Sequence, residues 1–108
     1  MCNDSKDVSL ENVRLEVAGD AVIANQSCKI AIKNSMISAG GRAIDAIENA
    51  SVVVENSIIE GRKQSIFVAG TATIEAGSSL FRGPIDPISR KKIIDRGGNS
   101  FEQLMAEE

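Results

Sequence analysis

The chain has 108 residues, the size of one domain, and its 43% hydrophobic and 25% charged residues are typical of a folded globular protein. The net charge of −3 makes nucleic acid an unexpected partner. The lack of His, Trp and Tyr excludes histidine-based metal sites and acid–base catalysis, and leaves few platforms on which bases or sugars could stack.

The cysteines and the first residues of the chain bear on where in the cell the protein is located. Cys2 and Cys28 are too few for a disulfide framework, and we expect Cys28 to be a small buried filler. Met1 to Asp4 lacks the apolar stretch of a signal peptide, and no run of 18 apolar residues predicts a membrane span. A native Met1 therefore predicts a cytoplasmic protein. The alternative is that an upstream signal was removed and Cys2 is lipidated, at the cell envelope or outside the cell.

A period of 22 residues organises the chain from residue 7 onward. Three sets of positions keep this spacing, namely Asn12, Asn34 and Asn56, then Leu15, Ile37 and Ile59, then Val22, Ile44 and Ile66. A fixed period of this length is typical of a solenoid, in which each repeat stacks on the one before.

One repeat, residues 29–50, shows how a coil is built. Ile30 and Ile32 alternate with more polar neighbours, which predicts a strand with one buried face. Asn34 has the same parity and is expected to point inward, and Ile37 is the next buried position. Gly40 and the residue after it predict a turn, and a second strand follows around Ile44.

Equivalent short strands in successive coils are expected to pair in parallel, about 4.8 Å apart. The predicted fold is therefore all-β, a right-handed parallel β-helix of three to four coils with a short irregular or helical C-terminal cap. The right hand follows the general rule for parallel crossovers. The fourth repeat looks imperfect, because Ile74 follows Val54 by 20 residues in the proposed inward column.

The segments at residues 30–37 and 52–59 resemble the right-handed parallel β-helix repeat of pectate-lyase-like proteins, over about residues 7–83. The resemblance implies a three-faced coil with an internal asparagine ladder at Asn12, Asn34 and Asn56. Family lyases use an arginine base and acidic calcium ligands. No pair of aspartates on consecutive coils matches that pattern, so no catalytic, cofactor-binding or metal-binding residue is carried over.

After the β-helix domain at residues 7–83, which follows a lead at residues 1–6, we expect a tail at residues 84–108. Pro84 and Pro87 cannot continue a central strand. Ser100, with Gln103 three residues later, resembles a capping box that opens a short helix. Phe101, Leu104 and Met105 would share one face of it, available for contact with the open solenoid end or another subunit.

Two surfaces are candidates for binding. Arg42, Arg62 and Lys63 are expected near one turn, where they could contact an acidic polymer; the alternative is that they are solvated turn charges. Phe67 is expected to face outward, where it would contribute to an interaction surface together with Phe101, Leu104 and Met105; the alternative is that it is one of several scattered exposed apolar residues.

These patterns predict a non-enzymatic scaffold that self-associates, most simply as a two-fold dimer. The alternative is a polysaccharide-binding or degenerate carbohydrate-active module. No cofactor is expected.

Overall fold

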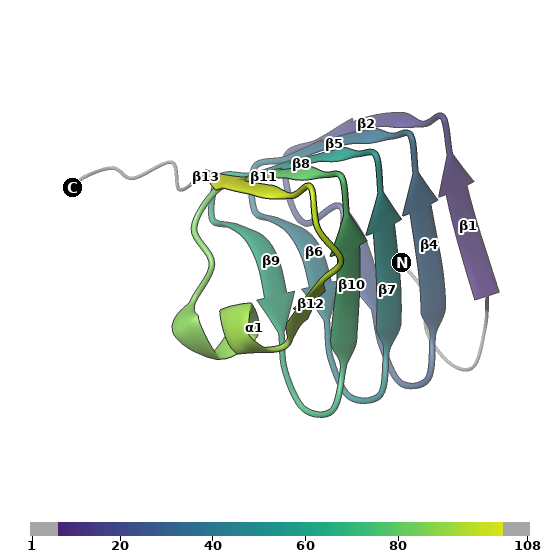
Figure 1. The fold of residues 1–108 in the computed structure, drawn as a ribbon, viewed down its shortest axis with the longest axis vertical. Coiled ribbons are helices and arrows are strands. Elements are labelled where there is room, and N and C mark those ends of the chain that lie inside the picture. Colours follow the sequence, from purple (N-terminus) through teal and green to yellow (C-terminus); the bar gives the residue numbers. More distant parts are fainter. Residues whose placement is uncertain (1–6, 103–108) are drawn as a thin grey trace.

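The computed structural model describes residues 7–102, which form a parallel β-helix, as predicted (Figure 1). Three coils contain three strands each, a fourth has a helix in place of its third strand, and two further strands begin a fifth. All strand pairs are parallel. No helix in residues 7–102 has the length and apolar character that a membrane crossing requires.

The strands form three sheets along the solenoid. The first sheet contains β1 (Asp7–Glu11), β4 (Lys29–Lys33), β7 (Ser51–Glu55), β10 (Thr73–Gly77) and β12 (Ile93–Asp95). The second contains β2 (Arg14–Val17), β5 (Met36–Ala39), β8 (Ile58–Gly61), β11 (Leu80–Arg82) and β13 (Ser100–Glu102). The third contains β3 (Val22–Ala24), β6 (Arg42–Ala46) and β9 (Gln64–Val68), with helix α1 (Pro87–Lys91) following in the fourth coil.

The strand register keeps the 22-residue step through the fourth repeat. Val54 pairs with Ala76, and Ile74 pairs with Val52. The predicted alignment of Val54 with Ile74 is therefore wrong. Two backbone hydrogen bonds show that the turn after β9 has the same length as its counterpart in the preceding coil. Ala69 N–H donates to Ala46 O, and Thr71 N–H donates to Glu48 O.

The core is one cluster of mostly aliphatic side chains, which stack in columns inside the coils. Ile32, Ile37, Ile44, Val54 and Ile59 are fully buried, as their alternation with polar residues predicted. Cys28 is buried and disulfide-bonded. The only other cysteine of the chain, Cys2, lies outside the described residues.

The corner between the first and second sheets contradicts the expected internal asparagine ladder. Asn12, Asn34 and Asn56 are exposed, and their φ angles of 56°, 50° and 49° are left-handed. Asparagine tolerates this conformation better than most residues do. The residue that turns inward at this corner is the following serine, since Ser35 and Ser57 are buried.

The serines form the hydrogen-bonded ladder that was expected of the asparagines. Ser57 Oγ accepts from Ser35 N–H at 3.1 Å and donates to Glu55 O at 2.8 Å. Ser35 and Ser79 repeat this pattern in the neighbouring coils. Each hydroxyl thus satisfies two backbone groups that the tight corner leaves without strand partners.

The C-terminal segment also differs from its prediction. The helix is α1, which begins after Asp86, whose carboxylate accepts from Ser89 N–H, and has Pro87 in its first turn. The expected helix at Ser100 is wrong, because Ser100–Glu102 pairs in parallel with β11 as strand β13. Leu104 and Met105 lie outside the described residues.

Candidate functional site

Arg42 is held in place on the outer face of the third sheet. Its guanidinium lies 4.0 Å from the centre of the Phe67 ring, Nε donates to Gln64 Oε1 at 2.8 Å, and Nη1 is 3.4 Å from Asp45 Oδ2. With three partners, its charge is largely committed within the molecule. It therefore does not complete a free basic cluster.

Arg62 and Lys63 occupy the turn between β8 and β9, and both are exposed. Their backbone N–H groups donate to Ala39 O and Gly41 O of the preceding coil. Neither side chain makes a hydrogen bond or ion pair with another described residue. Of the three predicted anion contacts, these two are thus available to an external ligand, while Arg42 beside them is not.

A polar ladder runs along the turn that precedes the third sheet. Arg42 N–H donates to Asp20 Oδ1 at 2.8 Å, and Gln64 Nε2 donates to Asp86 Oδ1 at 2.9 Å. Ser89 Oγ donates to the same Asp86 oxygen at 2.7 Å. Desolvation raises the pKa of Asp86, but hydrogen bonds from Ser89 and Gln64 outweigh it, so the net pKa lies below its ordinary value. The ladder anchors α1 to the coils.

The predicted aromatic contact residues are covered in similar ways. Phe67 is half-buried under Arg42. Phe101 stacks on Phe81, with ring centres 5.1 Å apart, and the Arg90 guanidinium lies 3.9 Å from the centre of the Phe101 ring. Phe67 and Phe101 belong to different sheets, so they do not form one patch.

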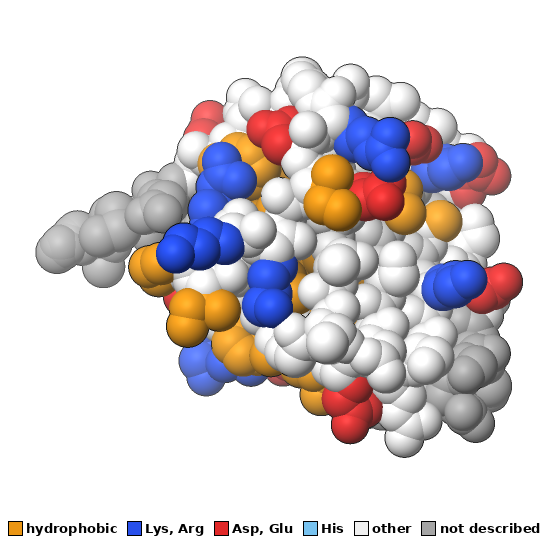
Figure 2. All heavy atoms as spheres, turned by 60° about the horizontal axis from the view of Figure 1, so that its bottom comes forward, with side chains coloured by type: hydrophobic (Ala, Val, Ile, Leu, Met, Phe, Trp, Pro, Cys, Tyr) orange, Lys and Arg blue, Asp and Glu red, His pale blue; other side chains and the backbone are white. Residues whose placement is uncertain are grey.

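Sequence reasoning missed the most exposed large hydrophobic residues. Ile88 of α1 is 67% exposed and Ile94 of β12 is 45% exposed, both near the C-terminal end. Figure 2 shows hydrophobic side chains gathered toward that end of the molecule, interspersed with Lys and Arg. The available signal for Ile88 was its place directly after Asp86 and Pro87, a preferred cap and first residue of a helix.

The corner between the first and second sheets carries a shallow groove along the solenoid. The exposed asparagines Asn12, Asn34 and Asn56 line it, together with a neighbouring column of Arg14, Met36 and Ile58. The three amide side chains make no hydrogen bond with another described residue. Each amide therefore offers a donor and an acceptor to solvent or to a ligand beside an aliphatic surface.

Backbone geometry alone does not explain three identical residues at this corner. The corner between the third and first sheets has three equally left-handed positions, occupied by Gln26, Glu48 and Gly70. A left-handed φ angle is therefore compatible with other residues in this chain. The asparagines differ from those residues in the regular column of neutral amides that they present.

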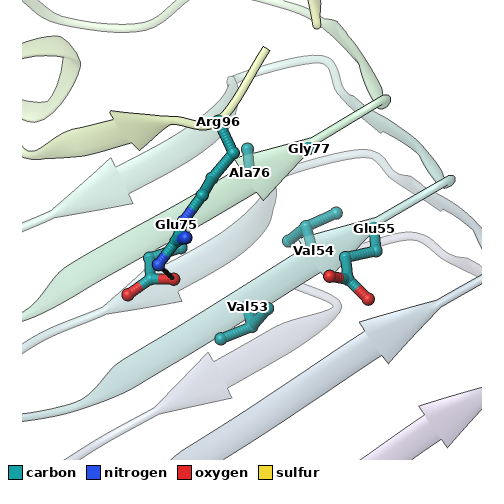
Figure 3. Close-up of a pocket in the computed structure, with 7 residues that line it drawn as sticks. All are labelled: Val53, Val54, Glu55, Glu75, Ala76, Gly77 and Arg96. Atoms are coloured by element: carbon teal, nitrogen blue, oxygen red, sulfur yellow. Dashed lines mark hydrogen bonds and ion pairs between the residues drawn. The ribbon is translucent and has the colours of Figure 1, made fainter. Parts of the chain in front are cut away.

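A smaller hollow of about 230 Å³ lies on the outer face of the first sheet near its C-terminal edge (Figure 3). Arg96 reaches across it to Glu75, with Nη2 at 2.6 Å from Oε1, while Glu55 and Val53 lie on the neighbouring strand. This ion pair ties the segment after β12 to β10. The arginine is thus committed to a contact within the fold.

No three acidic or cysteine side chains within residues 7–102 gather in a way that could hold a metal ion. Comparison of the chain with protein-family models, with curated proteins and with solved structures finds no match.

Proposed function

We propose that this chain is a structural scaffold that associates with a second copy of itself through the N-terminal end of the solenoid. The observation that supports this is a contrast in burial between the first and second coils. Inward residues of the first coil are only partly buried, whereas their register partners one coil later are buried. The partly buried residues are Val8, Leu10, Leu15 and Val17, and their partners are Ile30, Ile32, Ile37 and Ala39.

The backbone supports the same conclusion. Within residues 7–102, β1, β2 and β3 are each the terminal strand of their sheet, paired on one side only. An unpaired strand edge above partly exposed core favours association with another edge. A second copy related by a two-fold axis would present the same surface, so the N-terminal ends of the two copies would cover each other.

The test uses two lysine substitutions on one strand. Val8→Lys places a charge at the inward-facing end surface, whereas the control Ser9→Lys places it on the outer face of β1. Light scattering at micromolar concentrations is expected to give twice the chain mass for wild type and Ser9→Lys, and the chain mass for Val8→Lys, all with β-sheet circular dichroism. A wild-type protein that is monomeric throughout would refute the proposal.

A second candidate is a polysaccharide-binding module related to pectate-lyase-like β-helices. It is favoured by the corner groove, where Asn34 and Asn56 present amides with no hydrogen-bond partner among residues 7–102, beside Met36 and Ile58. Amides can hydrogen-bond to sugar hydroxyls while aliphatic side chains pack on the ring faces. This arrangement favours a neutral polymer over the acidic one expected from the basic residues.

Titration calorimetry with neutral and acidic polysaccharides distinguishes the two surfaces. We expect Asn34→Gly with Asn56→Gly, which suit the left-handed φ angles, to weaken binding of a neutral polymer, and Arg62→Ala with Lys63→Ala to leave it unchanged. Binding of acidic polymers alone, lost in the Arg62 and Lys63 variant, would move the site to the turn. Absence of binding to every polymer would remove the candidate.

A further inference from the structure

We propose that three separate contacts close the C-terminal end of the solenoid, so that self-association stops at a pair and does not continue as a filament. This inference rests on the self-association proposed above. It concerns the end that the pair leaves exposed, and each sheet supplies one of the three contacts.

In the third sheet, α1 takes the place of the next strand. Ser89 Oγ accepts from Val68 N–H at 2.9 Å, while its own proton goes to Asp86 Oδ1 at 2.7 Å. Ser65 N–H donates to Pro84 O at 3.0 Å. The edge of β9 that would pair with a next strand is therefore covered by a helix and a loop, which offer no strand edge to a further copy.

In the second sheet, a cation covers the end of the core. Phe101 of β13 stacks on buried Phe81. Arg90 is an exposed residue of α1, and its guanidinium lies over the Phe101 ring. A further coil at this position would have to bury or displace the guanidinium. Removing this exposed charge from water opposes such stacking.

In the first sheet, a carboxylate stands where an aliphatic residue would continue the core. Asp95 is the register partner of Ala76 in the column that contains Leu10, Ile32 and Val54. Its Oδ1 accepts from Gly97 N–H at 2.8 Å and from Asn99 Nδ2 at 2.6 Å. A charged residue at an inward position of an edge strand is a known means of preventing edge-to-edge pairing.

Charges at the two ends of the first sheet do not overcome these contacts. Asp7 and Glu11 bound β1, and Lys92 and Arg96 flank β12, which would suit head-to-tail stacking. However, Lys92 Nζ donates to Gly70 O at 2.7 Å and Arg96 is paired with Glu75. Both cations are already engaged within their own chain.

The N-terminal end has the opposite character. The partly buried inward residues of β1 and β2 are Val8, Leu10, Leu15 and Val17, all aliphatic. A head-to-tail contact would need both ends and would generate an open filament, whereas an isologous contact needs only the open end and closes on itself. With one end open and the other closed, the pair is the complete assembly.

The test removes two of the closing side chains. Arg90→Leu with Asp95→Val makes the C-terminal end apolar, and the control Lys33→Leu with Glu55→Val makes the same change of charge at exposed positions on β4 and β7, away from that end surface. We expect wild type and control to keep twice the chain mass as concentration rises in light scattering. The mass of the Arg90 and Asp95 variant is expected to grow with concentration beyond a pair.

Three outcomes would overturn the inference. Wild-type mass that grows beyond a pair would show that the C-terminal end is not closed, while leaving self-association intact. A folded Arg90 and Asp95 variant that remains a pair would show that these side chains do not limit assembly. A monomeric wild type would remove self-association and this inference together. If the double variant loses its β-sheet circular dichroism, Asp95→Ala alone is compared with Glu55→Ala in the same way.

Discussion

Neighbouring residues Asn34 and Ser35 show why side-chain direction was the hardest feature to predict at the corners. Strict alternation from Ile32 places Asn34 inward. The left-handed backbone at Asn34 shifts the alternation by one residue, so Asn34 is exposed and Ser35 is buried. The Asn-Ser repeat was visible in the sequence, but a positive φ angle is a property of the folded corner that spacing alone does not reveal.

Ser57→Ala is expected to destabilise the fold by about 1–3 kcal/mol, because Ser35 N–H would remain buried without its acceptor. Asn56→Gly is the control, since Asn56 is exposed and glycine accepts a left-handed φ angle. Urea denaturation of both variants measures the difference. Equal midpoints would contradict the serine ladder as a source of stability.

Ile44 and Asp45 test the facing of β6. Ile44→Ala should cost about 2–5 kcal/mol, because Ile44 is fully buried between Val22 and Ile66 in its column. Asp45→Ala should cost less than Ile44→Ala, because the loss of the ion pair with Arg42 at 3.4 Å is offset by removal of the buried Asp45 Oδ1, which has no hydrogen-bond partner among the described residues. Thermal or urea unfolding that ranks Asp45→Ala as the more damaging change would contradict this assignment.

At the scale of elements, the strands within the repeats were predictable and the elements after residue 83 were not. Alternating aliphatic residues define β4 and β6 directly. The segment after Ser100 is too short to decide between helix and strand by itself, and pairing with β11 decides it. The helix start was readable at Asp86-Pro87, a preferred cap followed by a preferred first residue, once the segment was considered apart from the repeat.

The cap of α1 makes a prediction about pH. The pKa of Asp86 is lowered in the fold, so its ionised form stabilises the fold above the unfolded pKa of about 3.9, and this contribution is lost as pH falls through the lower folded value. The Ser89 amide resonance should therefore shift in that acidic window, because Ser89 N–H donates to Asp86.

Two substitutions separate this cap from other carboxylates. Asp86→Asn keeps a capping oxygen and should abolish the Ser89 titration, whereas Asp95→Asn should leave it in place. Asp86→Ala should lower stability by about 0.5–2 kcal/mol, as for other lost helix caps. A Ser89 titration that persists in Asp86→Asn would assign it to another group.

For the whole molecule, the repeat predicts architecture because each coil uses the same 22 positions for the same purpose. The ends are where one coil has no neighbour, so periodicity carries no information about them. Arg90 on Phe101 and Asp95 at an inward position could not be identified from spacing, since both depend on how the last partial coil folds back. The same limit applied to the basic residues, because Phe67 contacts Arg42 only through stacking of coils.

The last partial coil is itself testable as a part of the fold. A chain ending at residue 95 lacks β13, which removes Phe101 from Phe81 and Asn99 from Ser79, whose N–H donates to Asn99 Oδ1 at 3.0 Å. Exposing an aromatic ring that is fully buried costs about 2 kcal/mol or more. The shortened protein should therefore unfold at lower urea concentration, because Phe81 loses the ring that covers it. A chain ending at residue 102 retains all these contacts and is the control. If both proteins unfold at the same urea concentration, β13 contributes nothing to the closure of the solenoid.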